Sequence, residues 1–543
     1  MDLDFNRNED KMKQALSLLR NRFQKIVLGG GVASIDKQHD KNKLTARERI
    51  AYLIDDHSSF TEIAAFAGYE MYEEYGGCPA GGTVAGIGYV SGRQVVILAN
   101  DQTVKAGAWF PVTGKKNLRL QEIAMENHLP VIYIVDSAGV FLPMQDEIFP
   151  DKEHFGRIFR NNARMSAMGI TQLSAVMGPC VAGGAYLPIM SDETLMVEGK
   201  GSIFLAGPYL VKAAVGETTD SETLGGAVTH TAISGIADYK FKTEEECLDQ
   251  IKKIIGTLGH QIQSAGFDRI NPAAPSKDGK DIYGLIPEDP TKPYDMLEII
   301  SRIVDAPGIQ QFKEDYGKTI ICGYARLEGW AVGIVANQRI VVKTKKGEVQ
   351  MGGVIYNDSA DKAARFIMNC NQKKIPLIFL QDVTGFMVGS RSEHSGIIKD
   401  GAKMVNAVAN SIVPKFTVII GNSYGAGNYA MCGKAYDPRL IVAWPSARIA
   451  VMGGDQAAKT LLQIQVSSLQ SRGQPVDPAE EKKLLATIRE RYEKQTSPYY
   501  AAARLWVDAL IDPLDTRQLL GEALKAANHN PRFSEFKTGV FQV

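Results

Sequence analysis

The sequence predicts an α/β protein with two homologous domains in one chain of 543 residues. Two observations lead to this prediction. Apolar, strand-like runs alternate with segments of helical spacing, a rhythm typical of parallel strands joined by helical crossovers. Two sequence blocks also occur twice: 130–140 (PVIYIVDSAGV) resembles 376–386 (PLIFLQDVTGF), and 177–186 (MGPCVAGGAY) resembles 420–429 (IGNSYGAGNY).

The spacing within the two copies is also similar. In the first copy 42 residues separate Asp136 from Gly178, and in the second 39 residues separate Asp382 from Gly421. The repeat is far too long for the unit of a solenoid. It therefore indicates two domains, each with two strands that lead directly into glycine-containing loops.

The elements of the first half follow in chain order. Apolar residues at helical spacing predict helices at 9–25 and 43–55. Residues 82–100 predict a β-hairpin with its turn at Ser91 and Gly92. The rest of this half is expected to form a strand at 131–136, a helix at 154–168, a strand at 172–178 and a helix at 183–190.

A segment rich in Pro, Gly, Asp and Lys, residues 265–295, separates the halves and predicts a linker. We place the linker at 271–295, between an N-terminal domain at 1–270 and a C-terminal domain at 296–543. The second half is then expected to contain a helix at 294–304, a hairpin at 320–336, a polar loop at 343–352, a charged helix at 478–494 and an irregular tail at 529–543.

Composition excludes several classes of function. Lys plus Arg and Asp plus Glu both number 61, which disfavours a nucleic-acid or membrane-surface partner. The six cysteines occur singly and no histidine pair has metal-ligand spacing, so neither a zinc ribbon nor another metal site is expected. The acidic N-terminus lacks a signal-peptide pattern, and we therefore expect a cytoplasmic protein.

The repeated glycines are the strongest candidates for chemistry. Gly183 and Gly184, and Gly425 to Gly427, lie where a strand is followed by a helix, a place that leaves backbone N–H groups without partners. Such N–H groups can stabilise an oxyanion. The alternative is that these glycines only allow close packing. Their paired repetition favours two oxyanion sites.

Side chains give weaker signals. Asp136 and Asp382 end strands at matching positions, where turn formation competes with catalysis as an explanation. Tyr186 and Tyr429 also match and are candidates for ligand packing. Basic clusters could capture a phosphorylated ligand or simply cover solvated helix faces; they include Lys43, Arg47, Lys115 and Lys116.

Longer stretches carry a family resemblance. They are residues 149–159, 177–186, 203–208 and 211–214 in the first half, and 385–389, 396–404, 421–433, 451–455 and 511–517 in the second. They resemble the carboxyltransferase (β) subunits of biotin-dependent acyl-CoA carboxylases, and the methylcrotonyl-CoA carboxylase type is the closest likeness.

The resemblance implies two tandem crotonase-like domains, each a ββα superhelix, and a homohexamer in which the N-domain of one subunit faces the C-domain of another. Acyl-CoA, with 3-methylcrotonyl-CoA the expected substrate, would bind the N-domain and carboxybiotin the C-domain. Release of CO2 leaves a ureido oxyanion that takes a proton from the acyl-CoA, and the resulting enolate attacks CO2. Two oxyanions then require two holes.

On this basis we assign the backbone donors. The thioester hole is expected at Val140, Gly183 and Gly184. The biotin hole is expected at Phe386, Gly425 and Ala426, with Gly427 as an alternative to Ala426 because the repeat aligns it with Gly184. The chain lacks an ATP-binding motif and an Ala-Met-Lys-Met biotin acceptor, so a partner subunit must bring biotin carboxylase and the biotin carrier.

Three alternatives remain open at this point. The chain could serve a propionyl-CoA or other acyl-CoA carboxylase. It could belong to a decarboxylase of the glutaconyl-CoA type, which works in the direction of biotin carboxylation. It could also be a non-catalytic acyl-CoA-binding paralogue, although both glycine blocks are intact.

Overall fold

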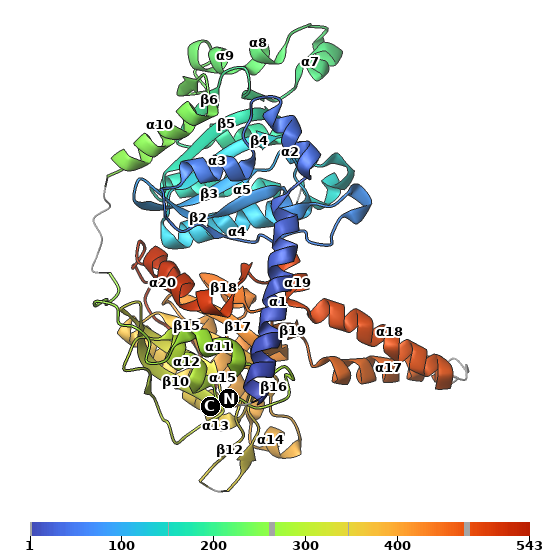
Figure 1. Ribbon diagram of the computed structural model, residues 1–543, viewed down its shortest axis with the longest axis vertical. Helices are drawn as coiled ribbons and strands as arrows, with labels where there is room; N and C mark the ends of the chain where they lie inside the picture. Colours follow the sequence, from blue (N-terminus) through green and yellow to red (C-terminus); the bar gives the residue numbers. More distant parts are fainter. Residues whose placement is uncertain (1–2, 150, 260–265, 346, 472–477, 543) are drawn as a thin grey trace. The chain divides into compact units, whose positions relative to one another are not determined.

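The computed structural model describes residues 3–149, 151–259, 266–345, 347–471 and 478–542 (Figure 1). The chain forms two compact units. The N-unit comprises Asn21–Gln263 and Ala502–Leu505, and the C-unit comprises Met1–Arg20, Ser264–Ala501 and Trp506–Val543. The segment 271–295 folds with the C-unit, where its short helix α11 (Ile282–Leu285) buries Ile282 and Tyr283.

The N-unit contains an eight-stranded sheet in the order β1-β2-β3-β4-β5-β6-β8, with β7 paired to β5. β1, β2 and β3 are antiparallel, and the strands from β3 onward are parallel. The expected hairpin at 82–100 is therefore confirmed. The strands are β1 (Thr61–Glu62), β2 (Thr83–Val90), β3 (Arg93–Asn100), β4 (Val131–Ser137), β5 (Gln172–Val181), β6 (Glu193–Val197), β7 (Ser202–Phe204) and β8 (Tyr239–Phe241).

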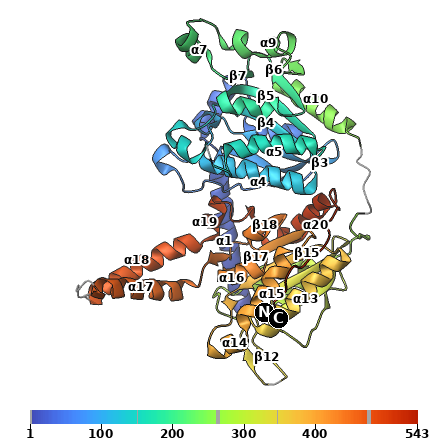
Figure 2. The same ribbon diagram turned by 180° about the vertical axis from the view of Figure 1, so that it is seen from behind.

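Helices α3 and α10 cover one face of this sheet (Figure 1). Thr45 and Glu48 form a capping box that starts α3 and satisfies two free N–H groups. Ile50 of α3 and Ile251 of α10 then pack on the strands. Figure 2 shows α4 and α5 on the opposite face. The helices are α2 (Val32–His39), α3 (Ala46–Leu53), α4 (Pro111–Asn127), α5 (Phe155–Ala167), α6 (Tyr186–Ile189), α7 (Pro208–Val215), α8 (Ser221–Gly225), α9 (Ala227–Ala232) and α10 (Glu244–Thr257).

The C-unit repeats the topology of the N-unit. Its eight-stranded sheet has the order β20-β18-β17-β15-β11-β10-β9, with β19 paired to β17. Each strand has a counterpart at the same place in the other sheet, so the repeat seen in the sequence is a repeat of the fold. The strands are β9 (Gln310–Gln311), β10 (Ile320–Leu327), β11 (Trp330–Asn337), β15 (Leu377–Val383), β17 (Lys415–Tyr424), β18 (Leu440–Ala443), β19 (Arg448–Ala450) and β20 (Ala509–Leu510).

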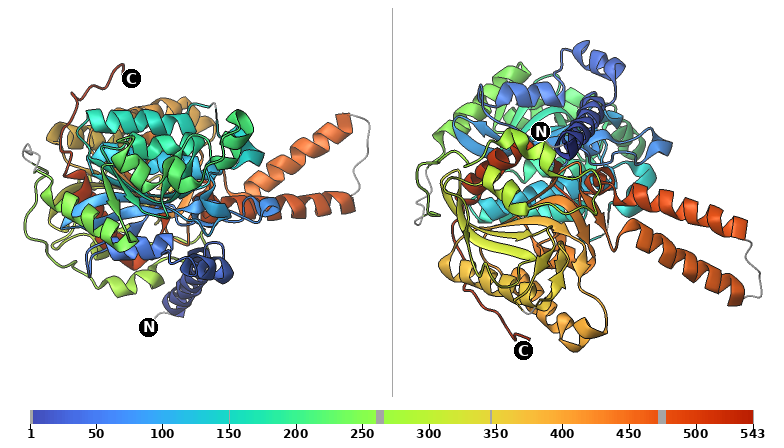
Figure 3. Two further views of the ribbon diagram at one scale, coloured as in Figure 1. Left: turned by 90° about the horizontal axis from the view of Figure 1, so that it is seen from above. Right: turned by 60° about the horizontal axis from the view of Figure 1, so that its bottom comes forward.

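The core of the C-unit lies between its sheet and two helices. Phe366 of α13 and Met404 of α15 pack on Val335 and Phe379. Helices α17 and α18 pack on each other and project from the rest of the C-unit (Figure 3). The helices besides α11 are α12 (Met296–Ile303), α13 (Asn357–Lys373), α14 (Ser390–His394), α15 (Ile397–Ala409), α16 (Gly425–Ala430), α17 (Gly454–Ser471), α18 (Pro478–Thr496) and α20 (Thr516–Ala527). Two further helices, α1 (Leu3–Val27) and α19 (Pro498–Ala503), contribute residues to both units.

Two local expectations need correction. Residues 343–352 are not only a loop, because β12 (Val342–Lys343) and β13 (Val349–Gln350) form a short antiparallel pair. The helix expected at 183–190 is a 3-10 turn, η5 (Ala182–Ala185), followed by the single turn α6.

A second small sheet pairs β14 (Val354–Ile355) with β16 (Gly385–Phe386) in parallel. The other 3-10 turns are η1 (Glu73–Tyr75), η2 (Pro79–Gly82), η3 (Lys105–Gly107), η4 (Leu142–Glu147), η6 (Gly279–Asp281), η7 (Lys434–Tyr436) and η8 (Pro513–Asp515).

Candidate active site

The repeated blocks lie at the carboxyl ends of adjacent parallel strands. In the N-unit, β4 pairs with β5 and its register shifts between Val135 and Ser137. In the C-unit, β15 pairs with β17 and its register shifts between Gln381 and Val383. Both shifts coincide with the repeated aspartate. Such irregularities redirect a strand end, and here each one precedes a glycine-containing loop.

Each strand-end aspartate is buried against the repeated glycine of the next strand. A Cβ atom at Gly178 would lie 1.8 Å from Oδ1 of Asp136, and one at Gly421 would lie 2.5 Å from Cγ of Asp382. Only glycine leaves room for the carboxylate at these two places. The repeated Asp and Gly are therefore one packing unit, and their spacing in the sequence is the length of the crossover between the two strands.

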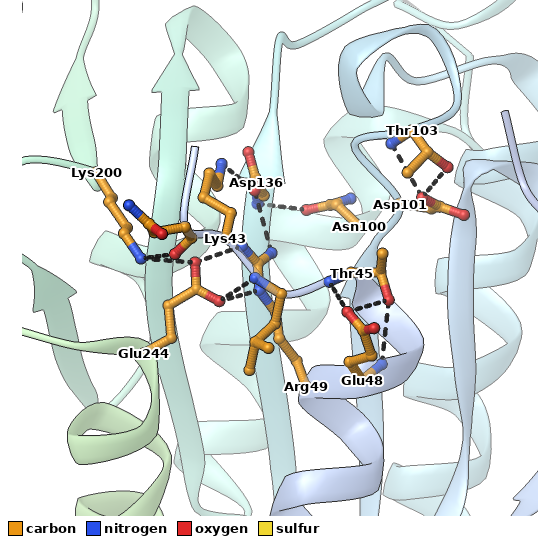
Figure 4. Close-up of polar contacts among 12 residues, drawn as sticks. Lys43, Thr45, Glu48, Arg49, Asn100, Asp101, Thr103, Asp136, Lys200 and Glu244 are labelled. Atoms are coloured by element: carbon orange, nitrogen blue, oxygen red, sulfur yellow. Dashed lines mark hydrogen bonds and ion pairs between the residues drawn. The ribbon is translucent and has the colours of Figure 1, made fainter. Parts of the chain in front are cut away.

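In the N-unit, two cations hold the carboxylate of Asp136 (Figure 4). Its Oδ2 lies 2.6 Å from Nζ of Lys43 and 3.1 Å from Nη1 of Arg49. Arg49 also donates from Nε and Nη2 to the Glu244 carboxylate, at 2.9 Å each. Burial lowers the pKa of Lys43, and the adjacent Asp136 opposes this effect. The N–H of Asp136 donates to Oδ1 of Asn100 at 3.3 Å.

In the C-unit, the partners of the carboxylate differ. Oδ1 of Asp382 accepts the N–H of Asn422 at 2.9 Å, and Oδ2 accepts the hydroxyl of Tyr294 at 2.8 Å. Nε of Arg339 lies 3.3 Å from Oδ2. The N–H of Asp382 donates to Oδ1 of Asn337, as in the N-unit. Burial raises the pKa of the Asp382 carboxyl, although Arg339 opposes this shift.

The loop after β4 leaves one backbone donor free. Trp109 donates to the carbonyl of Gly139 at 2.8 Å, and Phe141 donates to the carbonyl of Trp109 at 2.9 Å. Because backbone groups alternate in direction along an extended segment, the N–H of Val140 between them points away from Trp109. Within the described part of the chain this N–H has no acceptor. Gly139 has a φ of +89°, which turns the chain at this point.

The loop after β15 has the same arrangement. Met387 donates its N–H to the carbonyl of Ile355 at 2.9 Å. The N–H of the preceding Phe386 therefore points away from β14. Gly385 has a φ of +133°, and its counterpart Gly139 also has a positive φ. Val140 and Phe386 thus present matching N–H groups in the two units.

The second pair of donors lies where β5 and β17 end. η5 begins after Val181 and α16 begins after Tyr424, so Gly183 and Ala426 both occupy the second position of a first turn. N–H groups at this position have no carbonyl partner within their own helix. A Cβ at Gly427 would lie 2.6 Å from Cγ2 of Val383, which brings α16 close to the loop before Phe386.

Gly139 and Val181 bring the two donor segments of the N-unit together. A Cβ atom at Gly139 would lie 3.3 Å from the carbonyl oxygen of Val181. Gly183 packs under the ring of Phe155, while nothing lies within 4 Å of a Cβ built on Gly184. This open side of Gly184 leaves the space in front of the turn accessible to a ligand.

A groove borders the donor loop of the C-unit. Its volume is about 870 Å³, and Met387, Val388 and Gly389 line it directly after Phe386. Lys343 and Tyr356 lie on its other walls. The side chain of Val388 is exposed, so the groove offers both apolar and polar surface.

The basic residues chosen from the sequence lie in different environments. Lys43 and Lys116 are buried, and Nζ of Lys116 donates to the carbonyls of three residues: Ala64, Ala80 and Thr83. Arg47 forms a two-point ion pair with Glu62 at 2.8 and 2.9 Å. Lys115 is exposed and donates to the carbonyl of Arg504. All four cations thus have internal partners, and among them only Lys115 is exposed.

Tyr186 and Tyr429 lie in equivalent surroundings. Both side chains are 48% exposed, directly after the glycine turn of their unit. Tyr186 packs on Phe159 with ring centroids 5.9 Å apart, and Tyr429 packs on Tyr436 at 5.7 Å. Each ring is therefore about half exposed, two residues after the last glycine of its turn.

The comparison with known families gives a match over almost the whole chain. Residues 37–541 match the carboxyl transferase domain family. The chain belongs to the carboxyl transferase family. Since the match covers both units, the two sheets are parts of one carboxyl transferase.

Relatives of this carboxyl transferase are similar over almost their whole length. It is 47% identical to a probable mitochondrial methylcrotonoyl-CoA carboxylase beta chain of Drosophila melanogaster, covering 99% of this chain and 93% of the relative. It is also 47% identical to a biotin-dependent 3-methylcrotonyl-coenzyme A carboxylase beta1 subunit of Mycobacterium tuberculosis, covering 98% of each. The crystal structure of the P. aeruginosa geranyl-CoA carboxylase beta subunit matches with a TM-score of 0.87 and 39% identity, covering 100% of this chain and 98% of that one.

The carboxyl transferase shows no sign of a metal centre in the residues that the structure describes, where no group of three His, Cys, Asp or Glu side chains could hold an ion. The six cysteines are free and buried. Over the same residues, no helix has the length and apolar character needed to cross a membrane.

Sequence reasoning missed the side chains that hold the strand ends. Arg49, Arg339 and Tyr294 lie far along the chain from the aspartates they contact, and Glu244 lies far from Arg49, so no local pattern marks these contacts. Asn100 and Asn337 could have been found, because both end the second strand of the repeated hairpins.

Proposed function

We propose that this carboxyl transferase moves a carboxyl group from carboxybiotin to an acyl-CoA, and that 3-methylcrotonyl-CoA is its substrate. The observation that carries the proposal is the matched pair of outward-pointing N–H groups, on Val140 in one unit and Phe386 in the other. Two donor sets suit a reaction with two developing oxyanions. The names of the similar beta subunits support the choice of acyl group.

In this proposal the N-unit binds the acyl-CoA. The N–H groups of Val140, Gly183 and Gly184 would donate to the thioester oxygen as negative charge builds on it. Glycine at 184 leaves space in front of the turn for the thioester. Tyr186 would pack against the acyl chain, and exposed Lys115 could contact a phosphate of coenzyme A.

The C-unit would hold the biotin side of the reaction. When bound, carboxybiotin supplies the CO2 and its ureido group accepts the proton from the acyl-CoA. Phe386, Gly425 and Ala426 would direct their N–H groups at the ureido oxygen, and Tyr429 would pack beside it. The groove of about 870 Å³ next to Phe386 has room for the biotin rings and the arm that carries them.

Carriage of biotin by a partner subunit, and assembly of this chain into a homohexamer, are parts of the same proposal. They rest on the family resemblance. The roles of the basic side chains at 43, 47 and 116 are proposed to be structural, because internal carbonyl and carboxylate partners surround them.

A substrate panel tests the proposed function. The chain is purified with its biotin-bearing partner and assayed with ATP, bicarbonate and one of four thioesters: 3-methylcrotonyl-, propionyl-, acetyl- or geranyl-CoA. We expect the highest kcat/KM with 3-methylcrotonyl-CoA. A preference for propionyl-CoA or geranyl-CoA would replace the proposed acyl group, and no transfer to any of the four would contradict the catalytic assignment.

A further inference from the structure

One buried carboxylate joins the ends of the two strands that carry the proposed biotin-side donors. Asp382 stands at the end of β15, and its Oδ1 accepts the N–H of Asn422 on β17 at 2.9 Å. Phe386 follows Asp382 by four residues, and Gly425 follows Asn422 by three. Gly421 has no side chain, so the carboxylate of Asp382 lies directly against the backbone of β17.

Arg339 connects the carboxylate of Asp382 to Gly353 and, through it, to Thr384 in the loop before Phe386. Its Nε lies 3.3 Å from Oδ2 of Asp382. Gly353 packs so closely on the guanidinium that a Cβ there would lie 2.1 Å from Nη1 of Arg339. The carbonyl of Gly353 accepts the N–H of Thr384 at 2.8 Å. Contacts therefore run without a gap from Asn422 through the carboxylate and the guanidinium to Thr384.

The N-unit lacks this backbone tie. Pro179 stands where the repeat places Asn422, and proline has no N–H to donate. Among the residues that the structure describes, Oδ1 of Asp136 accordingly has no hydrogen-bond partner. Lys43 and Arg49 hold its Oδ2 instead. The tie from a carboxylate to the next strand thus occurs only in the copy proposed to bind biotin.

We propose that Asp382 is a positioning residue that fixes the separation between the N–H of Phe386 and the N–H groups of Gly425 and Ala426. Tyr294 serves the same purpose by holding Oδ2 of Asp382. An oxyanion hole works only when its donors already stand at hydrogen-bond distance from the developing charge, so a small displacement of one donor slows the reaction. The inference rests on the proposed function, because that function gives these donors their role.

Two variants loosen the tie to different degrees. Tyr294→Phe removes one hydrogen bond to Asp382 and leaves the ion pair with Arg339. Asp382→Asn keeps an oxygen that can accept the N–H of Asn422 but removes the charge that balances Arg339. The matched control is Tyr283→Phe, because Tyr283 is a buried tyrosine of the same unit that donates to Oδ1 of Asp512 at 2.7 Å.

Four measurements are made on the full chain. Deuterium exchange reports the mobility of residues 383–387 and 422–428. Carboxyl transfer from the carboxylated acyl-CoA to free biotin gives kcat and the KM for biotin, and a separate titration gives the Kd for acyl-CoA. Thermal melting shows that each variant is folded.

Tyr294→Phe should speed exchange in both segments and lower kcat about three- to tenfold, with the acyl-CoA Kd within about twofold of wild type. Asp382→Asn should have a larger effect of the same kind. Tyr283→Phe should change the melting temperature but neither exchange nor kcat.

Unchanged exchange in both segments of folded Tyr294→Phe would overturn the positioning role, whatever happens to the rate. Faster exchange with an unchanged kcat would also overturn it. A wild-type chain that transfers no carboxyl group would instead contradict the proposed function, and the exchange result would still decide whether Asp382 and Tyr294 hold the two segments.

Discussion

The two strand-end aspartates are both buried, but different partners stabilise their carboxylates. Asp136 is balanced by two side-chain cations, whereas Asp382 combines a guanidinium, a phenol and a backbone N–H. A buried carboxylate is costly unless partners surround it. Both arrangements supply such partners, which explains why aspartate at a strand end need not act on substrate.

The buried Lys116 also serves the structure. Its Nζ donates to the carbonyls of Ala64, Ala80 and Thr83 at 2.6 to 3.1 Å, in the segment where η2 precedes β2. Removing the amine takes a charged donor away from three carbonyls of this buried segment. We therefore expect Lys116→Met to lower the melting temperature, because hydrogen bonds from a charged donor are worth about 1.5–3 kcal/mol each.

The effect of Lys116→Met should depend on pH. Burial lowers the pKa of Lys116 to about 8, below its ordinary value of 10.5. Between these values the unfolded chain binds more protons than the folded chain, so stability from this site rises with pH. The free energy of unfolding of wild type minus that of the variant should increase between pH 8 and pH 10. A difference that stays flat or falls over this range would contradict the assignment.

At the scale of elements, the glycine turn after β17 packs closely against the end of β15 and the loop that follows it. A Cβ at Gly427 would lie 2.6 Å from Val383 and 3.4 Å from Cα of Gly385. Gly427→Ala should therefore displace α16 from the loop before Phe386 and lower kcat for transfer to free biotin by roughly tenfold or more. The acyl-CoA Kd, which we assign to the N-unit, should change little.

The control for Gly427→Ala is Gly156→Ala. Gly156 lies in α5, and no atom lies within 4 Å of a Cβ built there. Alanine at this position should be neutral or slightly stabilising, as expected for an exposed helix position. Equal kcat values for the two variants would show that the contact at Gly427 does not control the donors.

The sequence predicted those elements whose signals are local. Alternation of apolar residues and the turn at Ser91 and Gly92 gave the hairpin β2–β3, and apolar runs gave β4 and β15. The pair β12–β13 was missed because each strand is only two residues long, one apolar and one polar. A local pattern of that length cannot be distinguished from a loop.

The residues of the candidate site were likewise only partly predictable from the sequence. Repetition within the chain drew attention to Val140, Gly183, Phe386 and Ala426. It could not show that Lys43 pairs with Asp136, because that contact depends on how the segment before α3 lies against the end of β4. Charge alone suggested a ligand-binding role for Lys43, and burial against a carboxylate now indicates a structural one.

At the scale of the whole molecule, the match to the carboxyl transferase family covers almost the entire chain. The family match covers residues 37–541 and both sheets. We expect the purified chain to show no ATP-dependent carboxylation of acyl-CoA, and to transfer a carboxyl group between carboxylated acyl-CoA and free biotin. Incorporation of labelled bicarbonate measures the first activity. ATP-dependent incorporation by the chain alone would contradict the need for a partner.

If the two proposed holes lie in different units and units of different subunits face each other, one active site uses two subunits. The family resemblance sets the N-domain of one subunit against the C-domain of another. Gly184→Pro and Gly427→Pro each remove one first-turn N–H, where Gly427 is the alternative to Ala426 as a donor, and proline at 427 would also press on Val383. Each variant alone should lose most activity, because loss of one oxyanion donor costs about 10²–10³ in rate.

Coexpression of Gly184→Pro with Gly427→Pro tests this arrangement. If subunits face each other in pairs, a mixed pair contains one site with both substitutions and one site with neither. Random mixing should then restore about a quarter of wild-type activity, since half of the pairs are mixed and half of their sites are intact. Sites built within a single subunit would regain nothing on coexpression. Light scattering should show hexamers for both variants and for the mixture, so that failure to assemble is separated from failure to complement.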